Sequence, residues 1–220
     1  MSWSRTPAAA ATLLYLTASL VGCGPKAPDY QSIWSSSTAA TTTTPTSTEP
    51  PVPFSQYLES LGVSGEQVAP GALTDLTVSI PTPPGWDKVD KPNITPTTEL
   101  IAKHGTYPTA MLMVFKLTGD FDAAEVVKHG YADAQLSQNF KQLDASTANF
   151  HGFPSAVIQG DYDLKGTRLR GFNRIVIATG SPPANQQYLV QLTITSLANQ
   201  AVPEAADVEA IIAGFTVAAK

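Results

Sequence analysis

The chain has 220 residues and a formal net charge of −5, from 13 Lys and Arg against 18 Asp and Glu. Only 14% of its residues are charged, which argues against nucleic-acid binding, because that function needs clustered Lys and Arg. The acidic balance also argues against docking on anionic lipid by charge alone. We therefore expect no nucleic-acid partner, and any membrane association must come from another feature of the chain.

The first 22 residues have the pattern of a secretory signal peptide. Arg5 gives a positive start, and the apolar run over residues 8–20 is shorter than the roughly 20 residues of a membrane-spanning helix. Leu20-Val21-Gly22-Cys23 then matches a bacterial lipobox. The pattern predicts cleavage before Cys23 and its lipidation with diacylglycerol and a further acyl chain such as palmitate. The alternative is an unmodified Cys23 after an ordinary signal peptide.

Two or three acyl chains hold a protein stably at a membrane, so we expect the protein on the outer, periplasmic face of the cell membrane. Residues 23–53, rich in Ser, Thr and Pro, cannot bury enough apolar surface to fold and predict a flexible tether. Residues 54–220 are long enough for one domain with a sizeable core. Removing residues 1–22 takes away Arg5 and no acid, so the formal charge of the remainder is −6.

Within residues 54–220 the early elements are short. Residues 54–61 have apolar side chains at helical spacing, and Gly62 ends this predicted helix. A strand is predicted over residues 76–80, and residues 83–86 form a turn that places Trp86 against the core. A weak strand over residues 98–103 and a central, continuously apolar strand over residues 111–117 follow.

The longer elements come next. A helix is predicted over residues 122–139, with Asp122 and Glu125 as a capping box and a buried stripe of Ala124, Val127, Tyr131 and Ala134. Further strands are predicted over residues 143–150, 155–164, 168–179 and 188–194, with a turn at 151–154, a hairpin at Lys165-Gly166 and a loop at 180–183. A last helix spans residues 203–213, with Val208, Ile211 and Ile212 inward, Gly214 at its end and Phe215 sealing the core.

Successive hairpins force antiparallel pairing, because parallel strands need long crossovers. The element order therefore predicts an α+β fold, an antiparallel sheet with helices packed on it.

Six motifs, taken together, resemble the mycobacterial LpqN/LpqT lipoprotein family over residues 54–217. The motifs are Pro84-Gly85-Trp86, Leu117 to Asp122, His129-Gly130, Gly152 to Ala156, Asn173 to Ile177 and Tyr188 to Leu192. The resemblance implies a PsbP-like fold, an α/β/α sandwich with a central antiparallel sheet, in an actinobacterial cell envelope. It implies no catalytic residues. It suggests an accessory role in envelope lipid or mycolate export, or contact with host proteins.

The most interesting candidate site residues are Arg168, Arg170 and Arg174. Their even spacing puts all three on one face of a strand, where guanidinium groups suit a carboxylate or phosphate. They predict a ligand- or partner-binding patch, with Trp86 as apolar lining. The alternatives are a solvated face that pairs with Asp161 and Asp163 across the hairpin, and Trp86 as a core plug.

No catalytic, metal or cofactor pattern stands out. His104, His129 and His151 lack the spacing of a zinc site, and the latter two suit a helix surface and a turn. We therefore expect a non-enzymatic, membrane-anchored binding or accessory module whose partners are envelope proteins or a lipid-like ligand. The alternative is a hydrolase of envelope glycolipid that uses Asp161 or His151.

Overall fold

The computed structural model describes residues 51–220. The predicted signal peptide, the lipidated Cys23 and nearly all of the tether lie outside these described residues. The elements follow in the order α1 (Phe54–Ser60), β1 (Ser64–Val68), η1 (Pro70–Ala72), β2 (Leu76–Ser79), β3 (Trp86–Lys88), β4 (Glu99–Lys103), β5 (Thr109–Thr118), α2 (Ala123–Val126), η2 (Val127–His129), α3 (Ala132–Gln135), β6 (Lys141–Ser146), β7 (Ser155–Leu164), β8 (Thr167–Thr179), β9 (Gln187–Leu197), α4 (Ala205–Gly214) and β10 (Thr216–Ala219).

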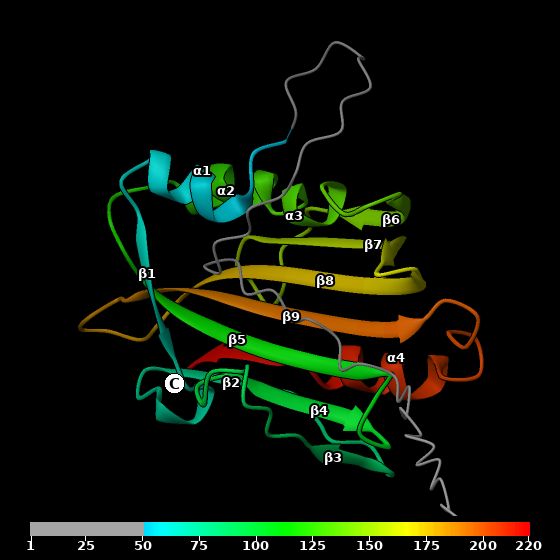
Figure 1. Cartoon of the computed structure of the whole chain (residues 1–220). Coiled ribbons are helices and arrows are strands. Elements are labelled where there is room, and N and C mark those ends of the chain that lie inside the picture. The colour runs from blue at the N-terminus through cyan, green and yellow to red at the C-terminus, as the bar shows by residue number, and fades with distance from the viewer. Residues whose placement is uncertain (1–50) are drawn as a thin grey trace, which may run out of the picture.

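One eight-stranded antiparallel sheet organises the described residues, with the strand order β3-β4-β5-β9-β8-β7-β6 and with β1 added beside β5. A separate ribbon pairs β2 with β10. In Figure 1, α1, α2 and α3 gather beside β6 to β8, whereas α4 passes behind β9 and β5. The predicted α+β sandwich with a central antiparallel sheet is confirmed.

The sheet has two apolar faces, because side chains alternate along each strand. On β8, Phe172 and Val176 pack in one core with Phe215, which follows α4. Ile175, between them, packs in a second core with Phe54 of α1. We call these the α4 face and the α1 face. On β8, Arg168, Arg170 and Arg174 are an even number of positions from Phe172 and Val176, so they lie on the α4 face.

The predicted hairpin and central strand are confirmed. β7 covers the predicted residues 155–164, and its register with β8 runs unbroken from Ser155 opposite Val176 to Leu164 opposite Thr167. The turn residues Lys165 and Gly166 both have positive φ, 51° and 80°, as a two-residue hairpin turn requires. β5 pairs with β9 on one side and with β4 and β1 on the other.

The predicted continuous helix over residues 122–139 is wrong. Its start is confirmed, because Asp122 Oδ1 accepts hydrogen bonds from the backbone N–H groups of Ala124 and Glu125. The segment then breaks into α2, η2 and α3. At Gly130 the backbone lies so close to the sheet that a Cβ would be 3.0 Å from the Cβ of Ala156, and the chain turns there. Ala124 is exposed, and Val126 is buried in its place.

Four strands differ from the sequence predictions, and one of them, β3, starts at Trp86 where only a turn is predicted. β1 and β10 lack a clear alternating pattern and were not predicted. The strand expected over residues 143–150 is β6, which ends at Ser146, and Phe150 forms only a bridge with Phe153. Within residues 51–220 no helix is long and apolar enough to cross a membrane.

Candidate functional site

Two of the three candidate arginines are paired with acids across the hairpin. Arg170 donates from Nε to Asp161 Oδ1 at 2.8 Å and from Nη2 to Asp161 Oδ2 at 3.2 Å. Arg168 Nη1 lies 3.0 Å from Asp163 Oδ1. The hydrogen bond from Arg170 lowers the pKa of the Asp161 carboxyl. The cross-hairpin pairing that the sequence left as an alternative is therefore what these two residues do.

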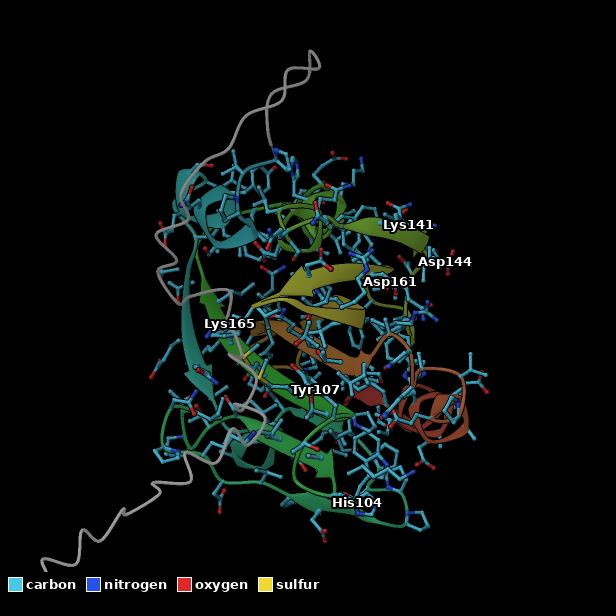
Figure 2. The ribbon with its side chains drawn as sticks, turned by 45° about the vertical axis from the view of Figure 1, so that its right-hand side comes forward. His104, Tyr107, Lys141, Asp144, Asp161 and Lys165 are labelled. Atoms are coloured by element: carbon cyan, nitrogen blue, oxygen red, sulfur yellow. The ribbon has the colours of Figure 1, made fainter. Side chains whose placement is uncertain are left out.

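The ion pairs of Asp161 and Asp163 with Arg170 and Arg168 form a charged corner of the sheet, and this corner extends to β6. Lys141 lies opposite Asp161 in the β6–β7 register, and Figure 2 shows Asp161, Lys141 and Asp144 together on that side of the molecule. Positive and negative groups therefore alternate across β6, β7 and β8. A free anion would meet acids as well as bases at this corner.

Arg174 differs from both neighbours, because it forms no ion pair with any acid in residues 51–220. Its guanidinium carbon lies 4.4 Å from the ring centre of Phe150 and 5.9 Å from that of Phe172. These distances are those of cation–π contacts. Burial lowers the pKa of Arg174. Arg174 is therefore the arginine of the predicted patch whose charge no acid in residues 51–220 neutralises.

Trp86 lies on β3, with β4, β5 and β9 between it and β8 in the strand order. It is 4% exposed and belongs to the core of the α4 face. Its indole Nε1 donates to Asp207 Oδ2 at 3.2 Å, and Lys103 Nζ lies 2.6 Å from the same oxygen. Trp86 therefore acts as a core plug that joins the sheet edge to α4.

The histidines remain apart from each other and from Asp161. His129 stacks on Tyr57 with ring centres 3.7 Å apart. His151 lies in the predicted turn, at φ 51°, with Nδ1 3.3 Å from the carbonyl oxygen of Val217. His104 lies in the turn after β4, far from Asp161 in Figure 2. Within residues 51–220 no cluster of three His, Cys, Asp or Glu could hold a metal ion.

The structure also forms a cleft that sequence reasoning missed. It lies between the loop 180–186, the end of β5 and residues 74–75, and its volume is about 400 Å³. Inside it, the Tyr188 hydroxyl donates to Asp75 Oδ1 at 2.9 Å. These residues are 113 positions apart, and Asp75 belongs to none of the six motifs, so no local pattern could have predicted their contact.

Comparison with known proteins gives a consistent result. Residues 50–218 match the family described as "Probable lipoprotein LpqN". The chain is 65% identical over 216 residues to a protein named LpqT from Mycobacterium tuberculosis, across 98% of this chain and 95% of that one. It is 64% identical to LpqT of Mycobacterium leprae, across 96% and 95% of the two chains.

A solved structure supports the fold independently. The crystal structure of LpqN, described as involved in cell envelope biogenesis of Mycobacterium tuberculosis, matches with a TM-score of 0.63 and 20% identity. The match covers 73% of this chain and 94% of LpqN. The family match and the identity to LpqT together show that this chain belongs to the LpqN lipoprotein family.

Proposed function

We propose that this chain is a non-enzymatic binding module, tethered by lipid on Cys23 to the outer face of the mycobacterial cell membrane. The lipobox at Cys23 and membership of a lipoprotein family support the anchor. The composition of residues 23–53 predicts a tether, and a coil of that length would span on the order of 30 Å, which would let the domain reach partners in the envelope. The description of LpqN as involved in cell envelope biogenesis supports an accessory role in that setting, such as lipid export.

The observation that carries the binding role is Arg174. Its neighbours Arg168 and Arg170 are paired with acids, whereas Arg174 is partly buried against Phe150 and Phe172 and forms no ion pair with an acid of residues 51–220. Removing a charge from water without a counter-charge costs free energy. A carboxylate or phosphate of a partner would supply that counter-charge through paired hydrogen bonds. We therefore place the contact with an acidic envelope protein or lipid-like ligand at Arg174.

Site-specific photo-crosslinking in mycobacterial cells tests this role. A photoreactive amino acid replaces Asn149, which is exposed and adjacent to Phe150, in the full-length chain. We expect a crosslinked partner that is lost in Arg174→Gln and kept in Arg168→Gln, a matched control that removes the same charge. Equal crosslinking in both variants, or none in the parent, would contradict the proposal. Cys23→Ser should release the protein from the membrane.

The hydrolase alternative lacks a supporting observation. Both carboxylate oxygens of Asp161 accept hydrogen bonds from Arg170, and its lowered pKa keeps the group ionised at neutral pH. An acid catalyst needs a pKa near the working pH. Steady product formation when the purified full-length chain is incubated with envelope glycolipids would overturn the non-enzymatic role.

A further inference from the structure

The cleft at Asp75 and Tyr188 lies near the C-terminus of the chain, because the backbone N–H of Lys220 donates to the backbone oxygen of Asp75 at 3.2 Å. In Figure 1 the C-terminus lies beside β2, which pairs with β10. Its volume of about 400 Å³ is within the roughly 300–1,000 Å³ of small-molecule sites. Pro182 and Pro183 of the loop 180–186 line one part of it, and Asp75, Lys116 and Tyr188 line another. The cleft therefore offers an apolar wall and charged groups to one ligand.

The Asp75 carboxylate is held in a fixed position. Its backbone oxygen accepts hydrogen bonds from the N–H groups of Ser181 at 2.9 Å and Lys220 at 3.2 Å. Tyr188 donates to Oδ1, and Gly180 packs so closely that a Cβ there would collide with the carboxylate. Three separate segments thus place one acid at the cleft, which is the preorganisation that a binding site requires.

Lys116 supplies a positive charge to the same cleft. It lies directly opposite Tyr188 in the β5–β9 register and is exposed. Lys116 forms no ion pair with Asp75 or with any other acid in residues 51–220. Burial and the hydrogen bond to Asp75 raise the pKa of Tyr188 to about 12, so this hydroxyl remains a donor at neutral pH. One acid and one base therefore line the cleft without an ion pair between them, and Glu66 lies directly opposite Lys116 in the β1–β5 register, outside the cleft lining.

We propose that this cleft binds a small zwitterion, an α-amino acid with an apolar side chain. The ligand's carboxylate pairs with Lys116, its ammonium group pairs with Asp75, and its side chain lies along Pro182 and Pro183. A ligand with only a carboxylate would be repelled by Asp75, and a ligand with only an ammonium group would be repelled by Lys116. Both should therefore bind more weakly than the zwitterion. The site does not depend on Arg174 and is independent of the binding role proposed above.

Saturation-transfer NMR on the full-length chain, purified in detergent, tests the proposal with L-leucine as the probe. We expect signal transfer to L-leucine, and weaker transfer to isovalerate, isoamylamine and N-acetyl-L-leucine amide, which lack one or both charges. Lys116→Gln should weaken L-leucine binding about tenfold, the scale of one charged hydrogen bond.

Lys128→Gln is the matched control, because Lys128 is exposed and pairs with Glu125 on another part of the surface. It should leave L-leucine binding unchanged. Asp75→Asn should weaken binding as Lys116→Gln does. If Asp75→Asn fails to fold, the exposed Lys116 still decides the outcome. No transfer to L-leucine, equal transfer to the uncharged analogue, or unchanged binding in Lys116→Gln would overturn the proposal.

Discussion

Two carboxylates in different parts of the molecule have pKa values shifted in opposite directions. Asp161, on the α4 face, has both oxygens bonded to Arg170, and that hydrogen bond lowers its pKa. Asp133, on α3 beside α1, has no cation at its buried Oδ2 within residues 51–220, and burial raises its pKa. The hydrogen bond from Arg170 therefore outweighs burial at Asp161, whereas burial outweighs the backbone hydrogen bond at Asp133.

The buried position of Asp133 is explained by a hydrogen bond that it accepts at the start of α1. Its Oδ1 accepts a hydrogen bond from the backbone N–H of Phe54 at 3.1 Å. That N–H starts α1 and has no partner within the helix, and the preceding Pro53 provides no side-chain cap. Asp133 thus caps the first helix of the described residues from 79 positions away.

The largest expected effect on the free energy of unfolding comes from truncating Phe54, whose backbone N–H is capped by Asp133. Phe54 is fully buried in the core of the α1 face, so Phe54→Ala should lower the free energy of unfolding by about 3–5 kcal/mol. Urea denaturation measures the change. Val52→Ala, at a side chain 49% exposed, should change it by less than about 0.5 kcal/mol. Similar values for both would mean that α1 does not pack as described.

The sequence predicted what depends on local patterns. The hairpin of β7 and β8 follows from alternation and from Lys165-Gly166, and the pairing of Asp161 with Arg170 follows from hairpin register. The capping role of Asp122 is equally local. These features need only the neighbouring residues, so they could be predicted without a three-dimensional structure.

What the sequence could not predict depends on distant parts of the chain. The segment Ser64-Gly65-Glu66-Gln67-Val68 forms β1 because it pairs with the buried strand β5, although its own residues alternate poorly. The bend at Gly130 arises from contact with Ala156 on another element. The Asp133 cap and the cleft around Asp75 likewise join residues far apart, which leave no local signal.

A second prediction concerns the packing next to Asp161. Gly160 precedes it on β7, and a Cβ at this position would collide with the ring of Phe140. Gly160→Ala should therefore lower the free energy of unfolding by about 1–3 kcal/mol through overpacking. Gly71→Ala is the control, because nothing lies within 4 Å of its Cβ position. An equally small change at both sites would mean that Phe140 does not pack against β7.

The third prediction tests the paired carboxylate itself. Asp161→Asn should lower the free energy of unfolding by about 1–2 kcal/mol at neutral pH, since it removes a charge-assisted pair that is partly exposed. Because the folded pKa is lowered, this stabilisation is present above the unfolded pKa of about 3.9 and is lost as the pH falls through the folded value. Chemical denaturation across acidic pH should show the variant and wild type converging.

Asp87→Asn gives the matched control for that charge change, because Asp87 is exposed on β3. It should have little effect on unfolding at any pH. A difference between wild type and Asp161→Asn that persisted at low pH would mean that the side chain stabilises the hairpin by packing and not through its charge.

The smallest effect, and the one of opposite sign, is expected at Asp133. Asp133→Asn keeps the Oδ1 acceptor for Phe54 but removes the unpaired buried charge, so the free energy of unfolding should rise at neutral pH by less than about 1 kcal/mol. A raised folded pKa means that wild-type stability falls as the pH rises from the unfolded value through the folded one, so this gain should shrink in acid. Asp133→Ala removes the cap and should cost about 1 kcal/mol. If the Asn variant lost as much as the Ala variant, the carboxylate charge would itself be favourable at the start of α1, and the contrast with Asp161 would disappear.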